Sequence, residues 1–187
     1  MTLPIRSSRL LIRMLSAAER DAFVAYRRVA DVARHQTWTT DYSAADADAL
    51  LADQPRAHLP TPGGWMQLAL LVADPVDGEV LVGDVAVGVD AVQPGTYELG
   101  VTLAPAHQGQ GYAQEALTTV IAWLMEVQGS HRVVMQGDPR NDAVLRLARR
   151  VGLRHEGSVL EGDWFKGEWT TLERFALLRR EWEARPR

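Results

Sequence analysis

The sequence of 187 residues contains no cysteine. Disulfides, thiolate metal ligands and a cysteine nucleophile are therefore excluded, and the absence is typical of an intracellular protein. The first thirteen residues carry Pro4, Arg6, Arg9 and Arg13 among short apolar stretches, so no secretory core is expected. No window approaches the ~20 consecutive apolar residues of a membrane span. We predict a cytoplasmic protein that does not bind a membrane.

The sequence also lacks any run of Lys or Arg. Twenty-four acidic against twenty basic residues give a net charge of -4. A phosphate-tracking basic face is therefore not expected, and nucleic acid is excluded as a partner. The five histidines have no cysteine or suitably spaced carboxylate companions, so no metal site is predicted. Without a linker or repeat, residues 1–187 are expected to form one domain.

The hydrophobic periodicity predicts an α/β (α+β) protein. Ser16 and Ser43 each precede an acid by three residues, the capping arrangement that begins a helix. Four helices are expected, at Ala17–Val29, Ala44–Asp53, Ala113–Val127 and Ala143–Val151. Seven strands are expected, at Arg9–Leu15, Trp65–Ala73, Glu79–Val92, Thr96–Leu103, His131–Asp138, Leu153–Val159 and Trp164–Leu178. Short turns between the strands from Trp65 to Leu103 predict an antiparallel meander within a mixed sheet.

The segment Leu103–Glu115 joins a strand end to a helix start through two glycines. Bare N–H groups at a helix N-terminus favour a phosphate or pyrophosphate, and Gly109 and Gly111 would let the backbone approach it closely. A P-loop is excluded because Tyr112 and Ala113 follow Gly111 in place of Lys and Ser/Thr. The dinucleotide fingerprint fails at Gln114 and lacks a βαβ unit. A glycine turn that caps the helix and binds nothing remains the alternative.

A third phosphate motif fits this segment. Gln108-Gly109-Gln110-Gly111-Tyr112-Ala113 resembles the Gln/Arg-x-x-Gly-x-Gly/Ala signature of the GCN5-related N-acetyltransferases (GNAT). Further segments resemble the branch of this family that acetylates ribosomal-protein N-termini: Glu98–Pro105, Gln114–Leu117, Asp138–Asn141, Val151–Gly157, Lys166–Trp169 and Phe175–Leu178. The resemblance covers roughly Tyr97–Trp182, with a weaker match over Leu3–Trp38.

The resemblance implies a mixed, mostly antiparallel sheet of about seven strands, splayed between the fourth and fifth and flanked by about four helices. Acetyl-CoA would lie between the strands that end near Leu103 and Asp138, with Gly100 as the bulge that opens the first. The residues implied in cofactor binding are Val101, Thr102 and Leu103 along the pantetheine arm, the amides of Gln108, Gly109, Gln110, Gly111, Tyr112 and Ala113 at the pyrophosphate, and Asn141 near the pantetheine end.

Acetyl transfer to an amine sets its own chemical demands. An amine must be neutral to attack a thioester, so a base must take its proton. Glu98 is the expected base, because related enzymes often place a carboxylate on this strand; the alternative is that it only faces solvent. A strand N–H near Leu99–Val101 would stabilise the oxyanion. Since no cysteine is present, the amine must attack the bound thioester itself.

The residues that donate a proton in relatives are missing. Ala148 stands where many members carry Tyr, and Val144 where ribosomal-branch members carry Ser. Tyr112 is therefore named as a candidate catalytic hydroxyl; otherwise the thiolate leaves toward solvent. The same departure keeps open a catalytically weak acyl-CoA-binding protein with a regulatory or scaffolding role. A binder of another phosphate ligand on an unrelated fold remains a third possibility.

Acceptor recognition is predicted only in outline. Trp38, Trp164 and Phe165, with Trp65, lie in segments that border the acceptor cleft in such folds, although aromatic residues there are also ordinary core residues. Glu161 and Asp163, expected in the turn before the last strand, are candidates to receive a cationic amine. The acceptor is expected to be a protein N-terminus or a small amine, and the chain a monomer or a homodimer.

Overall fold

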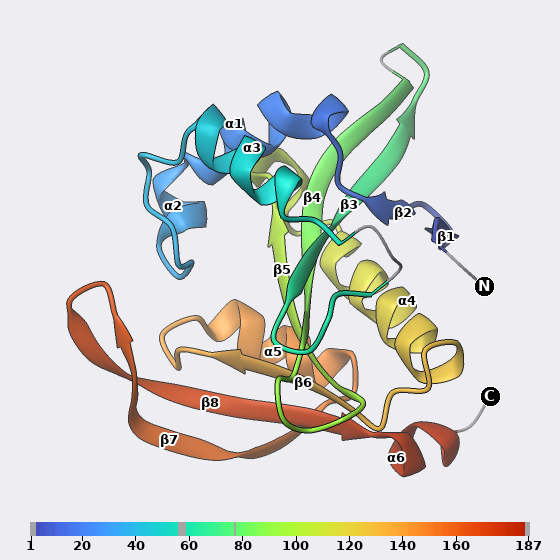
Figure 1. Ribbon diagram of the computed structural model, residues 1–187, viewed down its shortest axis with the longest axis vertical. Coiled ribbons are helices and arrows are strands. Elements are labelled where there is room, and N and C mark those ends of the chain that lie inside the picture. Colours follow the sequence, from blue (N-terminus) through green and yellow to red (C-terminus); the bar gives the residue numbers. More distant parts are fainter. Residues whose placement is uncertain (1–2, 56–58, 77, 186–187) are drawn as a thin grey trace.

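A mixed sheet of eight strands runs through the computed structural model, which describes residues 3–55, 59–76 and 78–185. The strands follow the order β1-β2-β3-β4-β5-β6-β8-β7, and only β5 and β6 are parallel neighbours in this part of the chain (Figure 1). Their bounds are β1 Ile5–Arg6, β2 Leu11–Met14, β3 Trp65–Asp74, β4 Gly78–Val89, β5 Thr96–Leu103, β6 Arg132–Gly137, β7 Arg154–Phe165 and β8 Glu168–Leu178. The expected fold class is confirmed, with β1 as one strand more than predicted.

The described residues form six α-helices and two short 3-10 turns. They are α1 Arg20–Arg27, α2 Ala30–Ala33, α3 Ala44–Ala52, α4 Tyr112–Glu126, α5 Asp142–Arg150 and α6 Arg179–Glu183, with the 3-10 turns at Ala17–Glu19 and Pro105–His107. The two predicted capping boxes are confirmed, since Ser16 pairs with Glu19 and Ser43 with Asp46. The helix expected from Ala17 to Val29 is wrong in detail, because a 3-10 turn precedes α1.

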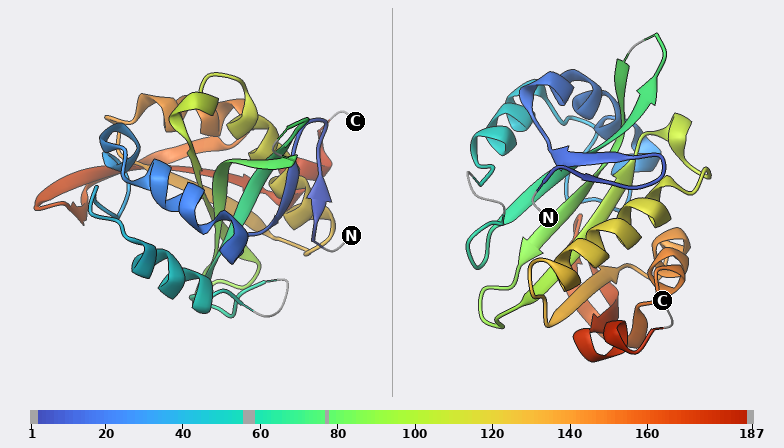
Figure 2. Two further views of the ribbon diagram at one scale, coloured as in Figure 1. Left: turned by 90° about the horizontal axis from the view of Figure 1, so that it is seen from above. Right: turned by 90° about the vertical axis from the view of Figure 1, so that its right-hand side faces the viewer.

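Helices cover both faces of the sheet, and two apolar clusters result. Alternation along β3 turns Met66, Leu68 and Leu70 toward α4, which lies in front of the sheet in the right-hand view of Figure 2. Ala69 and Leu71 pack instead with the α1 and α3 side. Because both faces are buried, the central strands read as continuous apolar runs rather than as strict alternation.

A buried ion pair fastens α1 to the sheet. Asp84, on β4, accepts hydrogen bonds from Tyr26 and from Arg27, whose Nη2 lies 3.3 Å from Asp84 Oδ2. Burial raises the pKa of the Asp84 carboxyl, and the Arg27 charge and the Tyr26 hydroxyl oppose that rise. The Arg27 guanidinium also stacks 3.7 Å from the centre of the Trp38 ring. The charge pair therefore fixes α1 and the segment that follows it.

The C-terminal hairpin differs from the prediction. The turn expected between Val159 and Trp164 is a bulge within β7, where the register shifts between Val159 and Asp163 and Glu161 has a positive φ of 49°. The reversal comes later, at Lys166 and Gly167, whose φ values of 50° and 91° suit a two-residue hairpin turn. Asp163 therefore lies in a strand.

The predicted splay is confirmed between β5 and β6. Three residue pairs join these strands, from Thr96 opposite Arg132 to Glu98 opposite Val134. The following part of β5, through Leu103, pairs only with β4 among the described residues. Its register runs through Gly100 without a shift, so the bulge expected at this residue is wrong. The strands thus leave one backbone edge of β5 free at the carboxyl end of the parallel pair.

Candidate active site

A groove opens where β5 and β6 separate. Its volume is about 450 Å³, and both strands, α5 and the loop before α4 contribute to its walls. Seven of the predicted cofactor residues line it: Val101, Thr102, Leu103, Gln108, Gly109, Ala113 and Asn141. Gln110, Gly111 and Tyr112 are not among the lining residues, although the same loop carries them. The groove combines an open strand edge at one end with a helix N-terminus at the other.

The loop before α4 presents free backbone donors. Gly109 and Gly111 have φ values of 74° and 84°, a region that favours glycine. The N–H groups of Gly109 and Gly111 have no backbone acceptor among the described residues, whereas Gln110 closes the turn that precedes it. The loop's shape comes from side chains that bond back to it: Gln108 Nε2 donates to the carbonyl of Leu103 at 3.1 Å. Such free amides beside the positive end of α4 suit a pyrophosphate.

Asn141 stands at the start of α5, on the opposite wall of the groove. Its Oδ1 accepts a hydrogen bond from the N–H of Val144 at 3.3 Å, so the carbonyl oxygen caps the helix. The carboxamide NH₂ remains the donor that this side chain can offer to a ligand. The cap thus explains how the local sequence holds Asn141 at the groove.

A second cavity, of about 570 Å³, continues from the groove on the other side of the splay. The two cavities share six lining residues: His35, Gln36, Gly100, Gln136, Gly137 and Asp138. Because the shared residues lie where β5 and β6 part, the groove and the second cavity form one continuous passage. A ligand in the groove can therefore meet a second ligand in this cavity.

Glu98 lines the second cavity. Burial raises the pKa of its carboxyl, while a hydrogen bond with Gln136 and the charge of Arg174 act in the opposite direction. A carboxyl group with a raised pKa is suited to take a proton near neutral pH. Glu98 also ends the paired part of β5, so its side chain stands beside the opening of the groove.

Three of the four predicted aromatic residues line the second cavity, namely Trp38, Trp65 and Phe165. Trp164 does not line it; this side chain is 60% exposed and packs edge-on against Trp169, with ring centroids 5.3 Å apart. Neighbouring residues of a strand face opposite sides, so Phe165 and Trp164 diverge. Asp163 lines the cavity with Phe165, whereas Glu161 is exposed and absent from its lining.

Tyr112 lies behind the groove rather than in its wall. Its ring packs under the Arg9 guanidinium, 4.4 Å from the Arg9 Cζ atom, and meets His107 edge-on. Val144 lines the groove, and Ala148 is buried. Valine and alanine side chains have no hydroxyl group, so neither residue can donate a proton to the leaving thiolate. In the described part of the chain, no cluster of three or more His, Asp or Glu side chains is placed to hold a metal.

A family model for the acetyltransferase (GNAT) domain matches residues 9–154. The chain belongs to the GNAT acetyltransferase family. The match runs from the turn before β2 to the start of β7 and includes every predicted cofactor-binding residue. None of the described helices of this GNAT protein is long and apolar enough to cross a membrane.

Curated relatives include an acetyltransferase of a ribosomal protein. The uncharacterized N-acetyltransferase YnaD of Bacillus subtilis is 30% identical over 87 residues, 46% of this chain and 51% of the relative. The [ribosomal protein uS5]-alanine N-acetyltransferase of Escherichia coli is 30% identical over 84 residues, 45% of this chain and 43% of the relative. The alignments thus span about half the length of these two relatives.

A solved structure with the same fold is the spermidine N-acetyltransferase of Vibrio cholerae in complex with CoA and spermine. Its TM-score is 0.78 at 16% identity, over 95% of this chain and 99% of that one. At this identity the likeness shows the fold alone.

Where the two cavities of this GNAT domain meet, the sequence reasoning assigned no role to Gln136 or His35 and used Asp138 only as the end of a strand. Gln136 and Asp138 follow the buried part of β6, and a polar residue at the carboxyl end of a buried strand was the available signal. His35, after α2, gave no signal, since a single histidine in a polar loop is common. Burial lowers the pKa of its imidazole, although Asp138 acts the other way, so this ring favours its neutral form.

Proposed function

We propose that this chain transfers the acetyl group of acetyl-CoA directly to a primary amine while both substrates are bound. The observation that carries the proposal is the passage between the groove and the second cavity. Free amides mark one end of this passage, and Glu98 marks the other. Family membership supports the same reaction class.

The groove fits acetyl-CoA in its polar groups. The free amides of Gly109 and Gly111 would bind the pyrophosphate, and Tyr112 and Ala113 add the N-terminal amides of α4. The unpaired edge of β5 from Val101 to Leu103 would hold the pantetheine arm as an added strand, with Asn141 on the facing wall. Acetyl-CoA supplies the activated acetyl group as a thioester.

The chain's own contribution is to hold the amine and take its proton. Glu98 accepts one proton from the ammonium form of the acceptor, and the neutral nitrogen then attacks the carbonyl carbon. A C–N bond forms, the C–S bond breaks, and the electron pair leaves on sulfur. The nitrogen, positively charged after the attack, loses its second proton to solvent, and Glu98 releases the first proton to solvent before the next turnover. A backbone N–H of Leu99–Val101 would stabilise the charge on the carbonyl oxygen. Because Val144 and Ala148 cannot donate, the thiolate takes its proton from solvent.

The second cavity would receive the acceptor. Its aromatic walls, Trp38, Trp65 and Phe165, suit an apolar or cationic group, and Asp163 adds a carboxylate that can pair with a cation. Two acceptor classes fit, a protein N-terminus and a small amine. The relatives whose names state an acceptor represent both classes.

One observation favours a rival. The apolar side chains at Val144 and Ala148 leave no proton donor where relatives carry one, which fits an acyl-CoA-binding protein with a regulatory or scaffolding role. Release of free thiol from acetyl-CoA separates the two, measured over a panel of N-terminal peptides, polyamines and aminoglycosides. The proposal predicts acceptor-dependent release with at least one class. Tight CoA binding with no release on any amine would favour the rival.

A further inference from the structure

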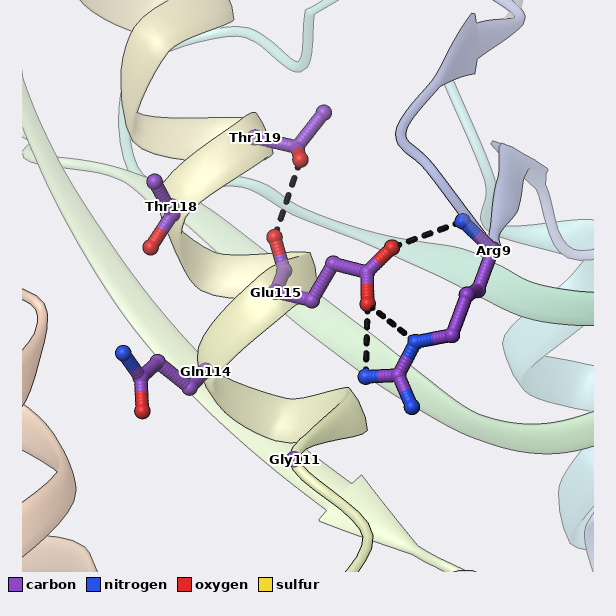
Figure 3. Close-up of a pocket in the computed structure, with 6 residues that line it drawn as sticks. All are labelled: Arg9, Gly111, Gln114, Glu115, Thr118 and Thr119. Carbon is purple, nitrogen blue, oxygen red and sulfur yellow. Dashed lines mark hydrogen bonds and ion pairs between the residues drawn. The ribbon is translucent and has the colours of Figure 1, made fainter.

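The turn between β1 and β2 is fastened to the first turn of α4 by one carboxylate. Glu115 Oε1 accepts hydrogen bonds from the hydroxyl groups of Ser7 and Ser8, at 2.6 and 3.0 Å, and from the N–H of Arg9 at 2.8 Å. Glu115 Oε2 lies 2.7 Å from both Nε and Nη2 of Arg9 (Figure 3). Arg9 and Glu115, separated by more than a hundred positions, thus form an ion pair in which two guanidinium nitrogens contact one carboxylate oxygen.

The same guanidinium also binds the loop before α4, residues 108–111, which we call the phosphate loop. Arg9 Nη1 donates to the carbonyl oxygen of Gln110 at 3.0 Å, and its plane covers the ring of Tyr112. In a trans peptide the carbonyl of one residue and the N–H of the next point in opposite directions. When Arg9 draws the Gln110 carbonyl toward the β1–β2 turn, it therefore turns the Gly111 N–H away from that turn.

We infer that Arg9, held by Glu115, is a positioning residue that aims the Gly111 N–H at the cofactor's pyrophosphate. The inference rests on the proposed function, because it takes the cofactor to bind at this loop. Glycines on both sides of Gln110 make such a device necessary. Glycine tolerates either sign of φ, so the peptide bond between Gln110 and Gly111 could otherwise rotate at little cost.

Arg9 acts from behind the loop and does not bind the phosphate itself. A hollow of about 380 Å³ contains Arg9, Gly111, Gln114, Glu115, Thr118 and Thr119 in its walls (Figure 3). This hollow shares no lining residue with the cofactor groove. Three of the five N–H groups of Arg9 are directed to Glu115 or Gln110.

The ion pair also keeps the site electrically suitable for an anion. An unpaired carboxylate in the first turn of α4 would repel a pyrophosphate nearby, and the Arg9 charge offsets it. Burial works to raise the pKa of Glu115, but hydrogen bonds from Ser7, Arg9 and Ser8 outweigh it and lower the pKa to about 2. The carboxylate is therefore ionised, and the pair intact, at any pH where the protein would work.

Calorimetric titration of the full chain with CoA and with dephospho-CoA tests the inference. Both ligands contain the pyrophosphate, but only CoA carries the 3′-phosphate. Arg9→Met is expected to weaken both equally, by about tenfold, the order expected when a charge-assisted hydrogen bond is lost. Glu115→Gln is also expected to weaken the binding of both ligands. Arg9→Lys keeps the charge without the planar fork and should lose most of the affinity too.

The matched control is Arg6→Met, an exposed arginine of β1 in the same hairpin. It should leave both affinities unchanged. Full affinity in Arg9→Lys would reduce the effect to net charge, and a loss for CoA alone would place Arg9 on the 3′-phosphate; either result overturns the inference. Unchanged affinity in Arg9→Met would also do so.

An NMR spectrum separates positioning from general damage. The Gly111 amide signal should shift strongly when CoA is added to the wild-type protein, and this shift should be lost in Arg9→Met while α4 core signals stay in place. Loss of the core signals would show a folding role instead and overturn the inference. Wild-type protein that bound no CoA would overturn both proposals, whereas binding without acetyl transfer would refute only the proposed function.

Discussion

Glu98 and Val134 form the last pair of the parallel ladder between β5 and β6, and the strands part beyond them. The position of the expected base is therefore coupled to the opening that admits the cofactor. The same opening joins the groove to the second cavity through Gly100 and Gln136. The expected base and the cofactor groove therefore both lie at the point where β5 and β6 separate.

Replacement of Glu98 by Gln tests its role as the base. Glutamine keeps the shape but cannot accept the proton, so kcat should fall by about a hundredfold or more. The dissociation constant for CoA should stay within about twofold, because Glu98 lies outside the cofactor groove. Glu126→Gln, the same change at an exposed position of α4, serves as the control. An unaltered kcat in Glu98→Gln would show that the carboxylate is structural.

The pH profile gives a second test of Glu98. Only the ionised carboxylate can accept a proton, and burial raises its pKa. The acidic limb of kcat/KM should therefore lie at higher pH than the value of about 4.3 expected for an exposed glutamate. For the same reason, the contribution of Glu98 to the free energy of unfolding should decline as pH rises through the Glu98 pKa, and Glu98→Gln should remove this contribution. A limb at the ordinary value would contradict this account.

Phe165 and Trp164 form a matched pair on opposite faces of β7. Phe165→Ala removes a wall of the second cavity, so KM for the acceptor should rise by about tenfold, corresponding to about 1.5 kcal/mol of lost aromatic contact. Trp164→Ala removes a larger but exposed ring and should leave acceptor KM unchanged. Steady-state kinetics with saturating acetyl-CoA measure both. A greater effect from Trp164→Ala would move the acceptor to the outer face of the hairpin.

The buried pair of Arg27 and Asp84 should dominate the stability of α1 on the sheet. Asp84→Ala leaves a buried guanidinium without its carboxylate, which is expected to lower the free energy of unfolding by about 3–5 kcal/mol. Replacing both residues by apolar ones, Arg27→Met with Asp84→Leu, should cost less than Asp84→Ala alone. Urea denaturation measures each value. A double variant less stable than the single one would contradict the argument.

The phosphate loop was the part of the site most readable from sequence. Its glycines, its lack of bulky side chains and the following apolar stripe all lie between Leu103 and Val127. The splay followed from the family resemblance, which implied about seven strands where the structure has eight. Local signals failed where tertiary contacts decide: β1 has two residues and exists only through its pairing with Ile12 and Leu11 of β2.

The acceptor side could not be read in the same way. Alternation assigns Phe165 and Trp164 to opposite faces, but only the register of β7 against β8 determines which face meets the cavity. The bulge at Glu161 resembled a turn because glycine and acidic residues are common in both. His35 and Gln136 come together from the segment after α2 and from β6, distant parts of the chain that no sequence pattern connects.

Initial rates test the central claim most directly. Thiol release is measured while acetyl-CoA is varied at several fixed concentrations of the best acceptor. Direct transfer with both substrates bound predicts double-reciprocal lines that intersect, and mass spectrometry should find one acetyl group on the acceptor and none on the protein. Parallel lines with an acetylated protein, or no release above the uncatalysed rate with any amine, would contradict the account.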